Sequence, residues 1–531
     1  MPGATSERRP WLRLGGDVLG AALLAAGAWA GLLALRKQIG LYDEGILLTG
    51  AELLLAGKVP YRDFYTNYPP GGFLLLALAF RLLGPSVLVE RGLGLALHVA
   101  VAAAAGRLAG RLQGRPFGLL AAGLCFAWLA GLGAAAYGWL AALGVAFAFC
   151  ARWLAAVRAR DGGRFLQAGL LLGAVSWFRH DLAVYLGLAL GALLLADLGL
   201  ARRAGRPGTI GARAAAGVAL GAVGAAAVFW LPWLGLAGPG RILSDVVFEQ
   251  AGHVQPARLL PFPPLVALTR PEGLPVRLPA LLVDPFPAAV VLSLAGPLLA
   301  LLAVLRPAPA GVAARSELWG IGALSLAVLP QLLGRSDVVH ALYAVPPALL
   351  LASLWATAPG RAGRRVAVAL ALALPVVLGA GALRVPVRPE AFPGLARASG
   401  VPDEAAANRR TVLAFLAEHT RPGESIYVGG TDHRWTIINE MDLYFLADRP
   451  GGTRVMQFDP GLTNRRDVQL QMAADLESSG TRVAVLSGRY VLSYEPNLSQ
   501  RPGSSELDAY LHAHFSVAEV AGPYRLLVRT R

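Results

Sequence analysis

The sequence predicts an α-helical polytopic membrane protein of about 11 transmembrane helices, with a C-terminal extracytoplasmic α/β domain. Hydrophobic residues make up 55% of its 531 residues and charged residues only 15%, whereas soluble domains carry about 25% charged residues. Apolar runs long enough to cross a bilayer recur as far as residue 384, and the composition changes sharply after about residue 386. We therefore predict a multi-span membrane domain at 1–385 and a soluble extracytoplasmic domain at 386–531.

The distribution of arginine predicts the orientation of the spans. The net charge is +15, and cytoplasmic loops of membrane proteins carry an excess of Lys and Arg. A cytoplasmic N-terminus places every basic cluster inside, provided that 71–84 lies along the interface; if 71–84 spans, most clusters fall outside. Nucleic-acid binding would need a basic patch on a soluble face, and the sequence shows none, so we do not expect nucleic-acid binding. The expected spans are 14–35, 88–106, 117–133, 139–157, 165–179, 182–198, 210–234, 286–305, 318–334, 340–358 and 366–384.

Two external loops and the tail complete the prediction. The first external loop, 36–87, carries interfacial helices, and a second, 235–285, is rich in proline and is expected to form an ordered flap over an interfacial site. In the tail, helical patterns and short β-branched runs alternate, which is typical of a small α/β domain. The expected helices are 404–419 and 464–479, and the expected strands are 425–428, 482–486 and 524–528.

Asp43 and Glu44 follow the first apolar run and are the first candidates for chemistry. An ionised carboxylate at a membrane face can deprotonate a hydroxyl nucleophile or bind a sugar hydroxyl. The alternative is structural, because an acidic residue before Ile46-Leu47-Leu48 can cap a helix. For Glu44, the sequence does not decide between a contact with the substrate and a helix-capping role.

Two further external turns each contain Arg, Asp and His. The first is Arg179-His180-Asp181, and the second contains Arg335, Asp337 and His340. Charges at the membrane are costly and are functional candidates by default, and the planar guanidinium suits phosphate. The alternative for the first turn is that Arg179 pairs with Asp181 and ends a helix. No tight ligand spacing supports a metal site, so we expect no metal and no cofactor.

These motifs resemble the GT-C superfamily of polytopic glycosyltransferases, in particular its protein mannosyltransferase, aminoarabinose transferase and Rgt-type branch. The resemblance is carried by the acidic pair, the interfacial helix and Tyr68-Pro69-Pro70-Gly71 within 42–84, with further support at the two Arg/His turns. It implies a polyprenyl-phosphate-linked sugar donor, Asp43 as general base and inversion at the anomeric carbon. Some members carry a second acidic residue in the second external loop. Here that turn has Tyr137 and no carboxylate, so the acceptor class and metal requirement stay open.

The predicted function is transfer of a hexosyl or pentosyl group to an envelope lipid, glycan or protein at the external face of a bacterial inner (plasma) membrane. Asp43 is the predicted catalytic residue. The predicted substrate-binding residues are Glu44, Lys58, Arg62, Asp63, Tyr65, Tyr68, Tyr137, Arg179, His180, Asp181, Arg335, Asp337 and His340. The alternatives are a transporter or flippase for a lipid-linked or envelope polymer, and a non-catalytic envelope scaffold.

Overall fold

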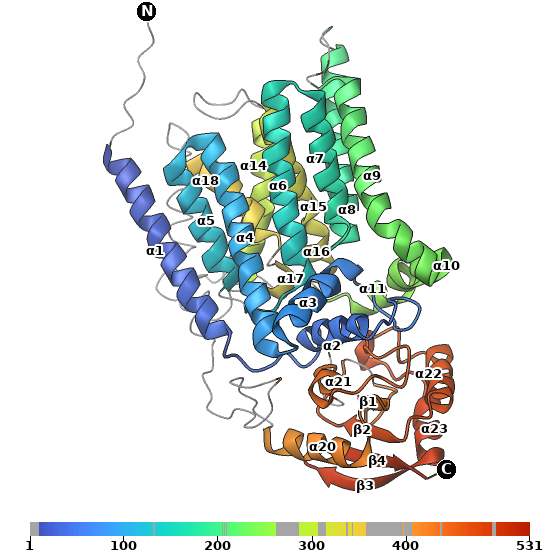
Figure 1. Ribbon diagram of the computed structural model, residues 1–531. Helices are drawn as coiled ribbons and strands as arrows, with labels where there is room; N and C mark the ends of the chain where they lie inside the picture. Colours follow the sequence, from blue (N-terminus) through green and yellow to red (C-terminus); the bar gives the residue numbers. More distant parts are fainter. Residues whose placement is uncertain are drawn as a thin grey trace, which may run out of the picture.

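The computed structural model describes residues 10–130, 133–203, 205, 208, 210–261, 286–305, 315–335, 338–341, 343–356, 397, 406–435, 438–490 and 495–530. A helix bundle forms one end of the molecule and a small α/β domain forms the other (Figure 1). The helices before the domain are α1 (Pro10–Ala34), α2 (Asp43–Leu55), α3 (Pro70–Leu83), α4 (Val87–Gln113), α5 (Arg115–Ala130), α6 (Gly138–Ala159), α7 (Gly162–Val175), α8 (His180–Arg203), α9 (Ala212–Ala237), α10 (Pro239–Leu243), α11 (Gln255–Arg258), α14 (Phe286–Leu305), α15 (Trp319–Ala327), α16 (Leu329–Gly334), α17 (Val338–Ala341) and α18 (Val345–Ala356).

The bundle is that of a multi-pass membrane protein. Within the described ranges, six helices are long and apolar enough to span a bilayer, and α3, α5 and part of α14 are apolar but shorter. The predicted count of about 11 is not confirmed, and the predicted span 366–384 lies outside the described residues. The predicted span 318–334 is divided into α15 and α16 at Val328.

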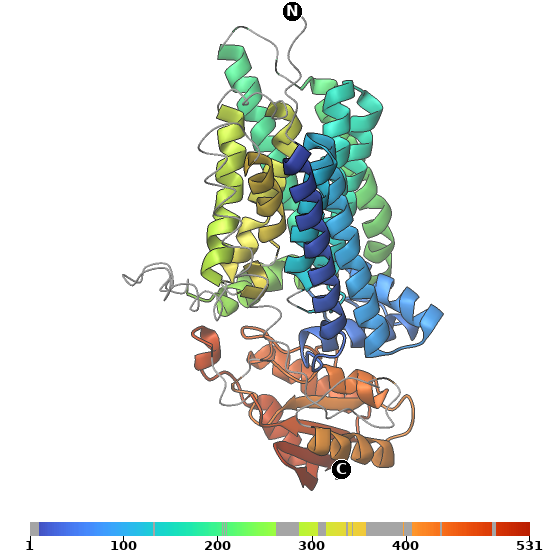
Figure 2. The ribbon, with the colours of Figure 1, turned by 90° about the vertical axis from the view of Figure 1, so that its left-hand side faces the viewer.

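The connections between the long helices alternate between the two ends of the bundle. The α4–α5, α6–α7 and α8–α9 connections, which hold the arginine clusters, lie at the end far from the α/β domain (Figures 1 and 2). The connections before α2, α6, α8 and α10 lie at the domain end. The basic clusters in these three described connections therefore lie at the end of the bundle opposite the Arg179-His180-Asp181 turn.

Close packing of small residues holds neighbouring bundle helices together, as is common in membranes. A Cβ atom added to Gly173 of α7 would lie 2.2 Å from the carbonyl oxygen of Ala222 in α9. Glycine is therefore the residue that allows α7 and α9 this approach.

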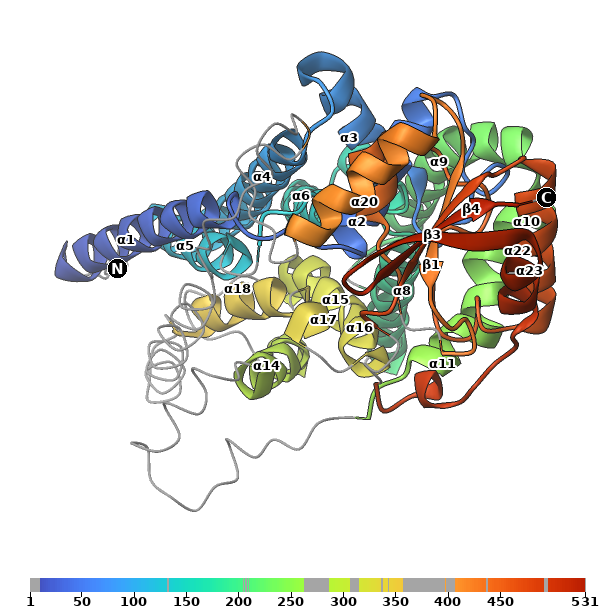
Figure 3. The ribbon, with the colours of Figure 1, turned by 90° about the horizontal axis from the view of Figure 1, so that it is seen from below.

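The C-terminal domain has three layers. Its elements are α20 (Ala406–His419), β1 (Ile426–Gly430), α21 (Asp442–Ala447), α22 (Arg466–Ser478), β2 (Val483–Ser487), α23 (Glu506–His514), β3 (Phe515–Ala521) and β4 (Tyr524–Arg529). The strand order is β1-β2-β4-β3, with β1 and β2 parallel and the other pairs antiparallel. Seen from the domain side, α20 lies on one side of the sheet and α22 and α23 on the other (Figure 3). The predicted tail helices and strands are confirmed within about two residues; α21, α23 and β3 were not predicted.

The domain shares a hydrophobic core with the interfacial helices. α2 and α3 lie across the base of the bundle, between it and the domain (Figure 1). Apolar side chains of both helices join one buried cluster with side chains of α20, α21, β1 and β2. The rings of Phe80 in α3 and Phe445 in α21 stack with centroids 5.8 Å apart.

The first part of the proline-rich loop 235–285 is helical. It forms α10, π-helical turns at Ser244–Phe248 and Gln250–Val254, and α11. Ion pairs join this segment to the domain, between Asp245 and Arg454, between Glu249 and Arg465, and between Arg258 and Asp459. The predicted flap is thus a docked helical segment as far as residue 261, and its remainder, 262–285, lies outside the described residues.

Candidate functional site

A cavity of about 400 Å³ lies where the bundle, α2 and the domain meet, and Asp43 forms part of its wall. It gathers residues from segments that are far apart in the sequence. Aromatic side chains and three arginines dominate its lining, which comprises Tyr42, Asp43, Leu47, Asn67, Tyr68, Pro69, Gly72, Phe73, Tyr137, Gly138, Trp139, Phe178, Arg179, Gln255, Arg258, Gln331, Arg335, His340, Tyr343, Ile438, Tyr490 and Glu495. Aromatic walls with a few converging charges are typical of small-molecule sites.

Asp43 is the first residue of α2, and its side chain is exposed to the cavity. Within the described part of the chain, its carboxylate makes no hydrogen bond or ion pair. The residue that caps α2 is Tyr42, which makes no side-chain capping bond, so the capping alternative for Asp43 is not observed. Desolvation by the surrounding protein raises the pKa of Asp43, and the positive charges of Arg258 and Arg335 oppose that rise. An accessible, unpaired carboxylate of this kind can accept a proton.

Three arginines line the cavity, and a carboxylate orients each of them. Nε of Arg179 donates to Asp181 at 2.8 Å, so the pairing alternative for this turn is observed, yet Arg179 still faces the cavity. Arg258 pairs with Asp459 at 3.2 Å. Arg335 pairs with Glu495 of the domain, with one bond of 3.1 Å. Oriented guanidinium groups are suited to hold a phosphate.

The walls beside Asp43 are brought together by close backbone contacts. The backbone N–H of Gly71, at the start of α3, donates to the carbonyl of Trp177 at 3.0 Å. A Cβ at Gly71 would lie 2.2 Å from that oxygen, so only glycine permits this contact. The contact fixes Tyr68 and Pro69 against the turn that carries Arg179.

A buried ionic cluster fixes the start of α2. Arg91 of α4 binds both carboxylate oxygens of Glu44, at 2.6 and 3.0 Å, and also the carbonyls of Leu35, Lys37 and Gln38. The preceding residue in α4, Glu90, accepts from the backbone N–H of Ala136 at 2.5 Å. We call these residues the Glu44–Arg91–Glu90 cluster. It connects the segment before Asp43 with the turn that carries Tyr137.

The structure brings together only part of the predicted site. Asp43, Tyr68, Tyr137, Arg179, Arg335 and His340 line the cavity. Glu44 lies in the buried ionic cluster, and Tyr65 is buried with its hydroxyl accepting from Gln250 at 2.7 Å. Asp181 accepts a hydrogen bond from Arg179 but does not itself line the cavity, and neither does His180. Asp337 lies outside the described residues.

Lys58, Arg62 and Asp63 lie away from the Asp43 cavity. Arg62 is exposed and pairs with Asp63 at 2.9 Å. Lys58 and Asp63 instead line a second, larger groove between α2 and the domain. Substrate contacts by these residues in the Asp43 cavity are therefore not supported by the geometry.

Several cavity residues were not predicted. Arg258 and Gln255 lie one turn apart on α11, and Tyr343, Tyr490 and Glu495 come from distant segments. The sequence signal for Arg258 is a cation one helical turn after a polar residue in an external segment. In the described ranges, no group of three His, Cys, Asp or Glu side chains is arranged to hold a metal ion.

No protein-family model and no curated protein sequence matches the chain. Among solved structures, ArnT from Cupriavidus metallidurans, bound to undecaprenyl phosphate, is 14% identical with a TM-score of 0.50. The match covers 96% of this chain and 97% of that one. The Archaeoglobus fulgidus oligosaccharyltransferase is 12% identical with a TM-score of 0.48, over 90% of this chain and 67% of that one. The chain therefore shares its overall fold with ArnT.

Proposed function

We propose that this protein is an integral-membrane glycosyltransferase that transfers a sugar from a polyprenyl-phosphate donor to a hydroxyl of an envelope lipid, glycan or protein. The observation that carries the proposal is the Asp43 carboxylate, which makes no hydrogen bond or ion pair within the described residues and is accessible in a cavity that three oriented arginines and eight aromatic side chains line. The structurally similar ArnT binds undecaprenyl phosphate, which supports a donor of this class.

The geometry supports a division of labour within the cavity. Asp43 takes the proton of the acceptor hydroxyl, whose oxygen then attacks the anomeric carbon from the face opposite the phosphate. That attack inverts the anomeric centre. The bond from the anomeric carbon to the phosphate oxygen breaks, and the phosphate leaves with its charge stabilised by Arg179, Arg258 and Arg335. The domain end of the bundle faces the outside of the inner membrane in this proposal.

Product analysis tests the proposal. The purified full-length chain in lipid nanodiscs is incubated with polyprenyl-phosphate hexoses and pentoses and an envelope lipid extract. Mass spectrometry should detect free polyprenyl phosphate and an acceptor heavier by one sugar, and NMR should show the inverted anomeric configuration. Envelope glycolipids from cells with and without the protein should differ by the same sugar. Movement of the donor across a bilayer without a new glycosidic bond would contradict the proposal and would favour a transporter.

A transporter or flippase is not favoured by the placement of charge. The charged side chains that line the cavity come from the domain end of the bundle and from the domain itself. A transport path would need polar groups near the middle of the bilayer.

The pH dependence of transfer should report the ionisation of Asp43. Because burial raises its pKa above the usual value of about 3.9, transfer should fall as the pH decreases through that raised pKa. Stability should change in the opposite direction: the contribution of Asp43 is complete at low pH and is lost as the pH rises through its folded pKa. Arg258 lowers the pKa of Asp43, so Arg258→Gln should move the inflection of the transfer rate to higher pH. As a control, the exposed Arg160→Gln should leave the inflection in place. If Arg258→Gln also left it in place, Arg258 would not be the charge that lowers the pKa of Asp43.

A further inference from the structure

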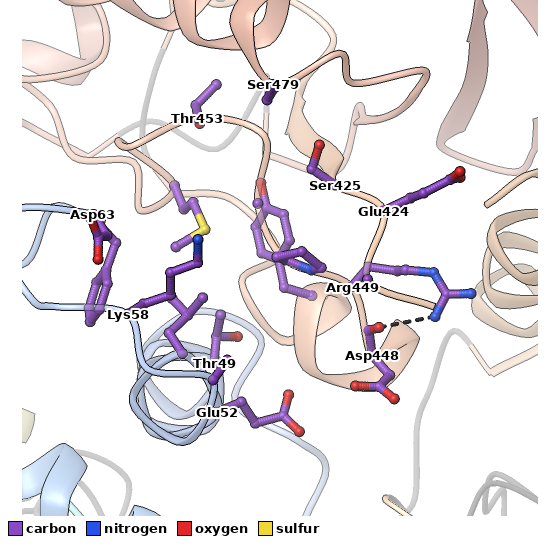
Figure 4. Close-up of a pocket in the computed structure, with 18 of the residues that line it drawn as sticks. Thr49, Glu52, Lys58, Asp63, Glu424, Ser425, Asp448, Arg449, Thr453 and Ser479 are labelled. Carbon is purple, nitrogen blue, oxygen red and sulfur yellow. Dashed lines mark hydrogen bonds between the residues drawn. The ribbon is translucent and has the colours of Figure 1, made fainter. Parts of the chain in front are cut away.

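A second groove, with a volume of about 950 Å³, lies between α2 and the C-terminal domain. The Asp43 cavity is less than half that size. Residues of α2 and of the segment 58–64 form one wall, and the domain forms the other (Figure 4). The groove thus lies at an interface between two parts of the chain, where ligand sites preferentially occur.

The helix α2 separates the groove from the Asp43 cavity. Asp43 and Leu47, which are one helical turn apart, face the cavity, whereas Thr49, Glu52 and Leu53 face the groove. At 1.5 Å per residue, the nine residues from Asp43 to Glu52 correspond to roughly 14 Å along the helix. A ligand in the groove would therefore occupy a position apart from the reacting centre.

Polar side chains dominate the lining of the groove. Hydroxyl groups come from both walls, carboxylates are present on both walls, and cations lie beside them; these residues are Thr49, Thr420, Ser425, Thr453, Ser479, Glu52, Asp63, Glu424, Asp448, Lys58, Arg449 and Arg482. Figure 4 shows the Lys58 ammonium extending into the space between the walls. Within the described ranges, Lys58 makes no side-chain hydrogen bond or ion pair. The hydroxyls of Thr49, Thr420, Thr453 and Ser479 already donate to backbone carbonyls, so they offer a ligand acceptor oxygens, whereas Lys58 offers donors. Acceptors beside a donor match a ligand that presents many hydroxyl groups.

Some of these lining residues also make contacts that fix the walls of the groove. Arg397 pairs with Glu52 of α2 and, at 3.0 Å, with Asp448 after α21. Arg449 donates to the carbonyl of Thr420 at 2.9 Å and to its hydroxyl at 2.8 Å. These contacts connect α2 to the domain and hold the groove in a preformed shape.

The sheet edge beside the groove is not available to an extended peptide. β1 is the outer strand on this side, and its edge already pairs with the segment 450–452. The backbone of Ile426 donates to Pro450 at 2.9 Å and accepts from Gly452 at 2.8 Å. Addition of a peptide strand, a common mode of peptide recognition, would require this pairing to break. The polar lining and the covered edge together favour a saccharide over a peptide.

We propose that this groove binds an oligosaccharide segment of the acceptor, several sugar units away from the hydroxyl that reacts at Asp43. Its assignment to the acceptor rests on the proposed function, whereas oligosaccharide binding itself does not. Binding of a remote part of the substrate would hold the acceptor near the reacting centre.

Direct binding to the full-length chain tests the proposal. Saturation-transfer NMR on the protein in detergent micelles would use soluble malto-, cello- and chito-oligosaccharides of three to six units. At least one series should bind. Ala56→Trp places a bulky ring at an exposed position in the groove and should weaken that binding at least about tenfold, which corresponds to about 1.4 kcal/mol. Ala513→Trp, an equally exposed position on α23, should bind as the unaltered protein does.

The two proposals fail in different ways. Asp43→Asn should retain oligosaccharide binding, and Ala56→Trp should retain slow hydrolysis of the donor by water while transfer to an oligosaccharide acceptor weakens. No binding by any series, or binding that Ala56→Trp leaves unchanged, would overturn the groove assignment even if transfer is observed. Binding of unstructured peptides that Ala56→Trp abolishes would overturn the choice of a saccharide.

Discussion

Asp43→Asn should lower the rate of sugar transfer by about 10²- to 10⁴-fold, the usual contribution of a general base. The amide has nearly the size of the carboxylate but cannot accept the proton of the acceptor hydroxyl. Because the Asp43 carboxylate makes no hydrogen bond or ion pair in the described part of the chain, the substitution should leave the fold intact. Single-turnover transfer of a radiolabelled sugar measures the effect.

Two controls separate the loss of the base from other effects. Asp467→Asn removes a carboxylate that is 65% exposed on α22 and should transfer at the unaltered rate. Donor binding, followed by the thermal shift that the donor produces, should be retained in Asp43→Asn because the three arginines remain. Asp43→Glu keeps the base but moves it by one methylene, so it should transfer at an intermediate rate. Unaltered transfer by Asp43→Asn would remove Asp43 from the mechanism.

Arg91→Met should destabilise the protein by about 3–5 kcal/mol, the usual cost of leaving one partner of a buried ion pair alone. Arg91 and Glu44 are only 3% and 4% exposed, and the substitution would also leave the carbonyls of Leu35, Lys37 and Gln38 without their donor. Denaturant unfolding in detergent micelles measures the loss. The double variant Arg91→Met/Glu44→Gln should recover part of it, because the Glu44 carboxylate is then no longer a buried charge without its partner.

A surface ion pair provides the matched control. Arg62→Met removes a guanidinium that is 50% exposed and pairs with Asp63, so it should leave the stability nearly unchanged, as is usual for exposed ion pairs. Equal losses of unfolding free energy in Arg62→Met and Arg91→Met would contradict the prediction that the buried cluster stabilises the protein more than an exposed ion pair does. If the cluster also positions Asp43 and Tyr137, transfer by the double variant should stay low after stability is partly restored.

The sequence was sufficient for the features that depend on local pattern. The apolar runs predicted most bundle helices, and the β-branched runs predicted β1, β2 and β4, because these patterns are read within one element. β3 was missed because five of its seven residues are exposed, so it lacks the apolar alternation of a half-buried strand. The predicted span 318–334 corresponds to Ser316–Gly334, one of the six described stretches long and apolar enough to cross a membrane, although α16 begins as a separate helix with Pro330 in its first turn.

Contacts between distant segments decided the rest. Lys58 and Asp63 are close to Asp43 in sequence, but α2 places them on its other side. Arg258 reaches the cavity because it pairs with Asp459, a residue about 200 positions later. Glu44 was left open, although charged residues at Glu90 and Arg91 inside a predicted span were a signal that a buried partner was needed.

The shared core of α2, α3 and the domain has a consequence for how this protein can be divided. Residues Ile39 to Phe80 and Val412 to Leu526 contribute to one buried cluster, although more than 300 residues separate them in the chain. Truncation before residue 406 would expose the apolar faces of α2 and α3 to water, beside Asp43. The C-terminal domain expressed alone would likewise expose the faces of α20 and α21 that cover these helices. The unit that must fold before Asp43 is correctly placed is thus assembled only once the last strand of the chain has been made.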